Sequence, residues 1–387
     1  MRPVALKEDV YWVGGIDWDL RNFHGYLTQR GSTYNAYLIV DEKITLIDSV
    51  KYYMVDEMLA RISKIVDPSK IDLLISNHVE MDHSGGLPEL KKRLPQATIY
   101  TSPNGERGLR AHYKQEWDFH VIKPGETVSL GKRSLQFFPT PMVHWPDNMV
   151  TYCPEEKILF SNDAFGQHIA STERFDDQLA LDTILFEAKK YYANIVLPYG
   201  AQVAKAIETV APLEITMIAP SHGLIWRSRI GEIVAEYGKW CANQVEEKAL
   251  IIFDTMWNST EKMARAIADA FDKKGISVSL LNLKHNHISD IMTDVLTARY
   301  ICMGSPTLNN NMLPTVASFL TYFKGLAPKK RKALAFGSYG WGGQSIGQVY
   351  EILKECQLEM MMDPIKIQYI PSSPDLLDLE DSVFKIL

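Results

Sequence analysis

The chain has 387 residues, of which 46% are hydrophobic and 23% are charged, and these values are ordinary for a globular protein of two or three domains. A formal net charge of -6 gives no support to nucleic-acid binding, and no apolar run is long enough to span a membrane. The first residues also lack the apolar core of a signal peptide. We therefore expect a cytoplasmic protein that binds neither nucleic acid nor membrane.

The cysteines are far apart in the sequence and form no CxxC pair: Cys153, Cys241, Cys302 and Cys356. This spacing disfavours a disulfide framework and a structural zinc site. It also excludes a rubredoxin-type iron centre within this sequence. We expect four buried thiols in a reducing compartment.

The first part of the chain alternates short apolar runs with polar turns, which predicts many short strands before and after a few helices. Helices are expected over 54–65, which Asp67-Pro68 ends, and over 87–93, after a Ser-Gly-Gly turn at 84–86. The expected strands cover residues 11–15, 34–40, 45–48, 71–77, 98–101, 136–143, 158–161 and 215–219. This pattern favours a β-sandwich flanked by helices.

Histidine or carboxylate side chains follow four of these expected strands. The segment His78-Val79-Glu80-Met81-Asp82-His83 comes directly after strand 71–77, and the other three strand ends deliver His144, Asp163 and His222. Metal sites in α/β folds are assembled from residues at several strand ends. Glu80 and Asp82 would also repel each other without a cation between them. The sequence therefore predicts a metal centre.

These motifs resemble a known family. HVEMDH at 78–83, His144, NDAFGQH from Asn162 and PSHG from Pro220 resemble the metallo-β-lactamase superfamily and, more closely, the flavodiiron proteins, or A-type flavoproteins. The hydrolase branch has His-x-His-x-Asp-His, whereas Glu80 stands where the second of those histidines would be. Zinc hydrolases work with neutral imidazoles, while an iron pair that changes oxidation state benefits from hard anionic oxygen ligands.

The resemblance implies a non-haem diiron site. One iron would be held by His78, Glu80 and His144, the other by Asp82, His83 and His222, and Asp163 would bridge the two. His83 is the least secure ligand, because one histidine is sometimes displaced from the metal in this family. The resemblance also places His24, His168 and Tyr199 around the substrate pocket, where a ring N–H or hydroxyl orients a ligand or donates a proton. The alternative for these three is an ordinary core side chain.

A second α/β unit is expected after a polar linker at 243–248, which gives domains over 1–246 and 247–387. Strands are expected at 249–254, 278–283, 300–304, 332–337 and 365–369, and helices at 261–271, 288–296, 314–323 and 344–356. This alternation predicts a doubly wound parallel sheet. The whole chain would then combine a metallo-β-lactamase-like αββα sandwich with a flavodoxin-like sheet.

Three loops at successive strand ends of this unit resemble the flavin-binding loops of flavodoxin. They are Thr255-Met256-Trp257-Asn258-Ser259-Thr260, Ser305-Pro306-Thr307-Leu308-Asn309-Asn310 and Ser338-Tyr339-Gly340-Trp341-Gly342-Gly343. The first opens into a helix and would hold the FMN phosphate, while the other two would flank the isoalloxazine ring, with Trp257, Tyr339 and Trp341 offering flat faces. Neither GxGxxG nor GxxxxGK[ST] is present in these loops, which disfavours a dinucleotide site and excludes a P-loop.

Together the two parts imply an oxidoreductase in which FMN feeds a diiron site that reduces dioxygen to water, nitric oxide to nitrous oxide, or both. The resemblance further implies a head-to-tail homodimer or dimer of dimers, with Trp145 near the partner's flavin, and rubredoxin or a reduced deazaflavin as electron donor. The alternative from another class is a dinuclear zinc hydrolase with a flavodoxin-like module. A pure electron carrier would require missing ligands, and none is missing.

Overall fold

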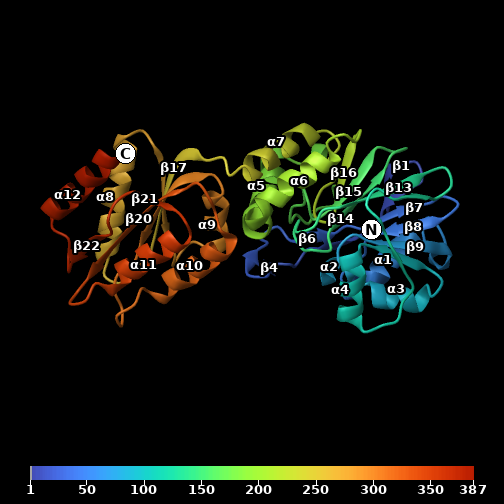
Figure 1. The fold of residues 1–387 in the computed structure, drawn as a ribbon, viewed down its shortest axis with the longest axis horizontal. Helices are drawn as coiled ribbons and strands as arrows, with labels where there is room; N and C mark the ends of the chain where they lie inside the picture. Colours follow the sequence, from blue (N-terminus) through green and yellow to red (C-terminus); the bar gives the residue numbers. More distant parts are fainter. Residues whose placement is uncertain (1) are drawn as a thin grey trace. The chain divides into compact units, whose positions relative to one another are not determined.

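The computed structural model describes residues 2–387, which divide into two compact units (Figure 1). The first unit runs up to His24 and continues over 28–191 and 199–238. The second contains the short segments 25–27 and 192–198 together with residues 239–387. The predicted division between residues 246 and 247 stays a prediction.

The first unit is built on two stacked sheets. The seven-stranded sheet has the order β1-β2-β7-β8-β9-β10-β11, and the five-stranded sheet has the order β12-β13-β14-β15-β16. Their strands are β1 (Val4–Lys7), β2 (Val10–Trp12), β7 (Tyr37–Ile39), β8 (Ile44–Ile47), β9 (Ile71–Ser76), β10 (Thr98–Thr101), β11 (Phe119–Val121), β12 (Thr127–Ser129), β13 (Ser134–Pro139), β14 (Met149–Cys153), β15 (Ile158–Asn162) and β16 (Met217–Pro220). Short additional strands are β3 (Gly15–Asp17), which pairs with β6 (Ser32–Tyr34), and β4 (Asn22–Phe23).

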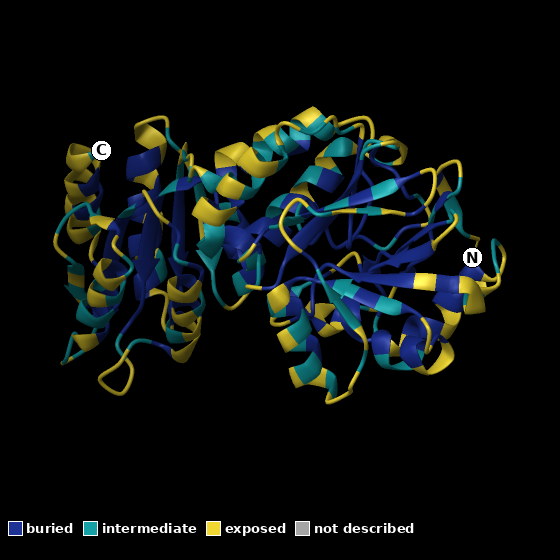
Figure 2. Cartoon of the chain, turned by 45° about the vertical axis from the view of Figure 1, so that its right-hand side comes forward, coloured by how far each residue is buried: buried dark blue, intermediate teal, exposed yellow. Residues whose placement is uncertain are grey.

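Alternation along the central strands divides their side chains between two cores. Ile47 and Ile75 pack between the two sheets, whereas Leu46 and Leu74, one position earlier, face the helices on the outer side. Figure 2 shows these strands as the buried interior of the unit and the outer helix faces as exposed. The arrangement confirms the predicted αββα sandwich.

The helices of this unit are short and amphipathic. They are α1 (Val55–Ile62), α2 (Met81–Ser84), α3 (Leu87–Arg93), α4 (Pro103–Tyr113), α5 (Leu181–Tyr191), α6 (Gly200–Val210) and α7 (Ile230–Cys241). Leu59 of α1 and Leu90 of α3 pack on the seven-stranded sheet, and Val210 of α6 packs against Val150 and Leu159 of the five-stranded sheet. Each sheet therefore has one face covered by the other sheet and one by helices.

The second unit is a parallel sheet with helices on its faces. The strand order is β18 (Ser277–Asn282), β17 (Glu246–Phe253), β19 (Ala298–Gly304), β20 (Lys332–Tyr339) and β21 (Glu359–Met360), and β22 (Ile365–Gln368) also pairs with β20. The helices are α8 (Ser259–Lys273), α9 (Ile288–Val295), α10 (Pro314–Leu326), α11 (Gln344–Glu355) and α12 (Ser373–Ile386), and the short strand β5 (Tyr26–Leu27) belongs to this unit as well. The order reverses at β17, so a crevice opens at the carboxyl ends of β17 and β19. This topology confirms the predicted flavodoxin-like sheet.

Several local predictions are wrong. The strand expected over 136–143 ends at Pro139, and β14 follows a turn that the sequence did not indicate. Pro139 and Pro141 have no N–H to continue a ladder, so the chain turns here. Residues 81–84 form one helical turn that was not predicted, and β17 begins at Glu246, inside the predicted linker.

Two further expectations concern the cysteines and the membrane. Cys153 and Cys302 are buried thiols as expected, but Cys241 and Cys356 are only half-buried, and none of the four forms a disulfide. Across residues 2–387, no helix has both the length and the apolar content that crossing a membrane requires.

Candidate functional site

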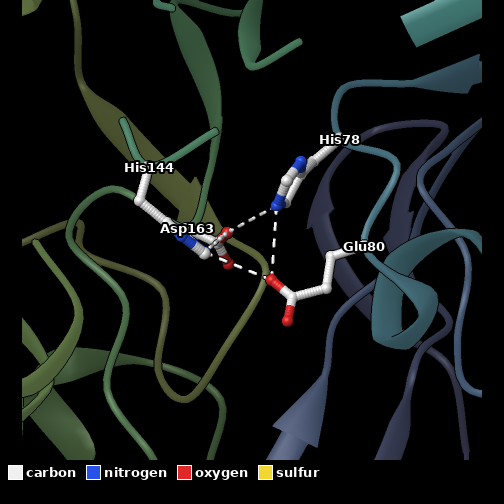
Figure 3. Close-up of side chains that lie close together, drawn as sticks. All are labelled: His78, Glu80, His144 and Asp163. Carbon is white, nitrogen blue, oxygen red and sulfur yellow. Dashed lines mark ion pairs between the residues drawn. The ribbon is translucent and has the colours of Figure 1, made fainter. Parts of the chain in front are cut away.

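Four of the predicted ligands meet at the edge of the sandwich (Figure 3). The Nε2 atoms of His78 and His144 lie 3.4 and 3.2 Å from the Glu80 Oε2 atom. The same two nitrogens lie 3.6 and 3.3 Å from Oδ2 of Asp163. The donor atoms of all four residues lie within 4.8 Å of one another, which is close enough for one ion to reach them all.

The other three predicted ligands form a second group on the opposite oxygen of Asp163. His83 Nε2 lies 3.0 Å and His222 Nε2 lies 3.4 Å from Oδ1 of Asp163. The same nitrogens lie 3.4 and 3.3 Å from the two carboxylate oxygens of Asp82. Asp163 thus turns one oxygen to each group, which is the geometry of a carboxylate that bridges two metal ions.

The local fold explains how adjacent residues serve different groups. His78 follows the end of β9, and Glu80 precedes α2, where its carbonyl accepts the N–H groups of His83 and Ser84. This single turn of helix places Asp82 and His83 away from Glu80. Asp163 follows β15 directly, and His222 stands two residues after β16. His144 differs from these ligands because it does not follow the end of a strand; it lies in the turn between β13 and β14.

The electrostatics of the two groups favour ionised carboxylates. Burial opposes ionisation of Glu80, but the close contacts with His144, His24 and His78 lower its pKa well below the ordinary value. Burial lowers the pKa of His144 and of His222, yet the carboxylates of Asp163, Glu80 and Asp82 outweigh it and raise these values to about 9 and about 10. Protons thus occupy the imidazoles when metal is absent, and binding of metal displaces them.

The donor atoms fit a pair of metal ions. Within residues 2–387, His78 Nε2, His83 Nε2 and both oxygens of Asp82 and Asp163 are buried and make no hydrogen bond. Buried polar atoms are normally hydrogen-bonded, so a cluster of six such atoms facing one another calls for cations. Three carboxylates among seven donors suit iron better than zinc.

Outer contacts hold two of the imidazoles in place. His78 Nδ1 lies 2.9 Å from Oδ2 of Asp147, which also accepts the N–H of Val79 at 2.8 Å. His222 Nδ1 donates to the carbonyl of Thr33 at 2.7 Å. Both contacts turn Nε2 toward the metal side. Nδ1 of His83 makes no such contact among the described residues.

The three predicted pocket residues lie in different places. His24 Nε2 lies 2.9 Å from Glu80 Oε1, and 73% of its side chain is exposed, so it links the metal centre to solvent. His168 is fully buried, contacts Ser32 Oγ at 2.6 Å, and its ring lies tilted at 4.8 Å from the His222 ring. Burial and the nearby His222 keep its pKa well below the usual value, so His168 stays neutral.

Tyr199 is the third predicted pocket residue. It lies in a 3₁₀ turn before α6 and is not among the described residues that line the cleft at the metal centre. Tyr191, which was not predicted, lies with its ring 5.9 Å from the ring of His222 and 5.2 Å from that of His168.

A cleft of about 1250 Å³ leads from the surface to Glu80, Asp82 and His144. Its rim carries the exposed side chains of Tyr52, Tyr53 and Met81. Trp145 lines the cleft and packs edge-on against His78 at 5.1 Å. His112 also lines it.

The second unit has its own cavity of about 700 Å³ at the carboxyl ends of its strands. All three predicted loops contribute to it, and of their residues only Asn258, Thr260, Ser305 and Gly343 do not line it. Thr260 and Ser338 bond to each other at 2.9 Å between loops. Trp257 and Trp341 are 88% and 92% exposed, which leaves flat apolar faces for a planar ligand.

The cavity fits a phosphorylated flavin. Thr255 Oγ1 is buried and has no hydrogen-bond partner among the described residues, and the N-terminus of the fifteen-residue helix α8 opens beside it. Asn258 has φ +63°, a conformation that turns the chain tightly into the helix. Unpaired hydroxyl and N–H groups at a helix N-terminus match a phosphate. The volume suits a ligand of FMN size.

Four residues that contact the predicted ligands, support them or line the flavin cavity were not predicted from the sequence: Asp48, Asp147, Tyr191 and Tyr369. Asp48 stands at the end of a predicted strand, so the search for polar side chains at strand ends that identified Asp163 could also have identified Asp48. Asp147 stands three residues after His144, and nothing in its local pattern signals its contact with His78. Tyr369 follows the half-exposed strand β22 and lines the cavity together with Ile370.

The comparisons with known proteins agree with this geometry. Residues 33–223 match the family described as ODP family beta lactamase, and residues 251–381 match the flavodoxin family. The chain is 44% identical to a nitric oxide reductase of Moorella thermoacetica, over 97% of this chain and 96% of that protein.

Two solved structures superimpose on essentially the whole chain. The rubredoxin oxygen:oxidoreductase of Desulfovibrio gigas has a TM-score of 0.97 at 42% identity, covering 100% of this chain and 98% of that one. The flavodiiron protein of Giardia intestinalis also has a TM-score of 0.97, at 34% identity, covering 100% and 96%. Because both domain families match and these relatives cover nearly the full length at 34–44% identity, the chain belongs to the flavodiiron protein family.

Proposed function

We propose that this protein is an oxidoreductase that reduces dioxygen to water or nitric oxide to nitrous oxide, with electrons that pass from FMN to a non-haem diiron site. Four electrons and four protons convert one dioxygen into two waters, and two electrons and two protons convert two nitric oxide molecules into nitrous oxide and water. When bound, FMN supplies electrons singly or in pairs, and the iron pair supplies them to the small oxidant.

One observation carries this proposal: Asp163 directs its two oxygens to two separate groups of buried donors, and the same chain contains a flavin-sized cavity. We assign His78, Glu80 and His144 to one iron, Asp82, His83 and His222 to the other, and Asp163 to both. The names of the relatives, nitric oxide reductase and rubredoxin oxygen:oxidoreductase, support the two substrates.

The chain's own residues orient ligands and move protons. Asp147 and the carbonyl of Thr33 fix the tautomers of His78 and His222. His24 bonds to Glu80 on one side and faces solvent on the other, so it stands where protons must enter. The neutral His168 packs against His222 and holds that ring in place rather than donating protons.

We further propose a head-to-tail homodimer, or a dimer of dimers, in which the flavin of one copy docks at the cleft of its partner. Exposed aromatic side chains rim both places, Tyr52 and Tyr53 at the cleft and Trp257 and Trp341 at the flavin cavity. A monomeric variant with full multi-turnover activity would refute this assembly. Cysteines that form no disulfide fit a reducing cytoplasm, where rubredoxin or a reduced deazaflavin is the proposed donor.

A dinuclear zinc hydrolase is the second candidate, and two features disfavour it. Glu80 replaces a neutral imidazole with a carboxylate, and the flavin cavity has no part in hydrolysis. Metal analysis together with the visible spectrum of the purified protein separates the two functions, because the hydrolase would contain zinc and no flavin.

Anaerobic stopped-flow spectroscopy tests the main proposal. The fully reduced protein is mixed separately with dioxygen and with nitric oxide while flavin reoxidation is followed at its visible band. We expect rapid reoxidation by at least one of the two gases. If both leave the flavin reduced in protein that contains two irons, the proposal is wrong.

A further inference from the structure

A buried carboxylate lies directly before the loop that would hold the FMN phosphate. Asp254 directly follows β17, which ends at Phe253, and it is 2% exposed. Its Oδ1 accepts the backbone N–H of Thr255 at 2.6 Å, and its Oδ2 accepts the hydroxyl of Thr315 at 2.5 Å. These bonds fix a negative charge one residue away from the phosphate loop.

Lys284 contacts both the carboxylate and the loop. It lies in the segment after β18, and its Nζ is 3.3 Å from Oδ1 of Asp254. The same ammonium donates to the carbonyl of Thr255. In a trans peptide the C=O and the next N–H point in opposite directions. Holding the Thr255 carbonyl therefore turns the N–H of Met256 the other way, away from Lys284.

Charge balance explains why this lysine is needed. A phosphate at the start of α8 carries close to two negative charges, and Asp254 adds a third at short range. Like charges in a partly buried site repel strongly unless a cation compensates them. Thr255 Oγ1, buried and without a hydrogen-bond partner among the described residues, marks the place where the phosphate would bind.

We infer that Lys284 is a positioning residue for the flavin phosphate: it compensates Asp254 and fixes the peptide between Thr255 and Met256, so that the site selects FMN over riboflavin. This inference rests on the proposed function, since it assumes that the cavity holds a flavin. It predicts a specific loss of phosphate recognition, not a general loss of flavin binding.

Titration of the full-length, flavin-free protein with FMN and with riboflavin tests it, by quenching of flavin fluorescence. We expect Lys284→Gln to weaken FMN binding about tenfold, the effect of one lost charge-assisted contact. The riboflavin affinity of the same variant should change by less than about twofold. Lys284→Arg should keep the wild-type ratio of the two affinities, and Lys385→Gln, which removes an exposed lysine of α12, should leave both affinities unchanged.

A double variant separates charge compensation from damage to the loop. Asp254→Asn combined with Lys284→Gln removes both charges, so the FMN-to-riboflavin ratio should return to within about threefold of the wild type. An unchanged ratio in Lys284→Gln, or no recovery in the double variant, would overturn the inference. Failure of the wild-type protein to bind either flavin would instead overturn the proposed function.

Discussion

Asp48 holds Asn77 by two hydrogen bonds, from the backbone N–H to Oδ1 at 2.8 Å and from the side-chain amide to Oδ2 at 3.0 Å. The same carboxylate lies 3.3 Å from Nδ2 of Asn162 and 3.5 Å from Oγ of Ser221. These three partners directly precede His78, Asp163 and His222. One buried side chain therefore sets the relative positions of three strand ends that carry proposed metal ligands.

Replacing Asp48 by alanine should destabilise the protein and empty the metal centre. The change leaves buried amide donors without an acceptor, which costs about 2–4 kcal/mol. We expect iron content to fall well below two per chain, and urea unfolding of metal-free protein to show the loss of stability separately. Asp72→Ala is the control, because the exposed Asp72 accepts the backbone N–H of Ile44 without a link to any ligand. Full iron content in Asp48→Ala would contradict the prediction.

Asp147 should control how tightly the metal at His78 is held. Its carboxylate anchors both the Nδ1 of His78 and the N–H of Val79, and loss of such an outer partner lowers metal affinity about 10- to 100-fold. Asp147→Ala should thus lose iron much faster than the wild type in the presence of a chelator, measured by the decay of the iron absorbance.

The matched control is Asp176→Ala. Asp176 is equally buried and accepts backbone N–H groups of Arg227 and Ser228, but it contacts no predicted ligand. That variant should lose stability and keep its iron. If both variants lose iron at the same rate, Asp147 acts through general stability and not through His78.

How far the sequence predicted this centre depends on how each ligand is presented. Asp163 and His222 follow apolar strands that end abruptly in polar residues, and such ends can be seen in the sequence. His144 was expected at a strand end for the same reason, but the ladder stops at Pro139 and a turn carries His144 to its place. The strand-end pattern therefore singled out His144 although no strand ends directly before it.

Contacts between distant segments could not be predicted in this way. The Asp48 cluster joins residues up to 173 positions apart, and each of its bonds depends on the packing of two sheets. The same holds for Tyr369, whose N–H bonds the carbonyl of Tyr339 and thereby brings a fourth loop to the flavin cavity. Strand β22 is half-exposed, so its weak pattern gave no sign of a functional loop after it.

Glu80 should decide which metal the centre prefers. Glu80→His recreates the histidine-rich pattern of zinc hydrolases and removes an anionic oxygen that favours iron. In protein expressed with equal iron and zinc supplies, we expect iron to dominate in the wild type and zinc in the variant, as measured by elemental analysis. Glu89→His is the control, since Glu89 lines the same cleft but pairs with Arg93 and not with the ligands. A variant that still contains mainly iron would show that Glu80 does not set the preference.

Trp257 and Trp341 should bind the flavin through their ring faces. Both indoles are almost fully exposed at the cavity, and an aromatic stack contributes about 0.5–1.5 kcal/mol. Changing either residue to alanine should therefore weaken FMN binding about two- to tenfold. It should also raise the fluorescence of the bound flavin, because the indole that quenches it is gone. Trp18→Ala removes a half-exposed indole of the first unit and should change neither quantity. Equal quenching in all three variants would mean that the flavin does not stack on either loop.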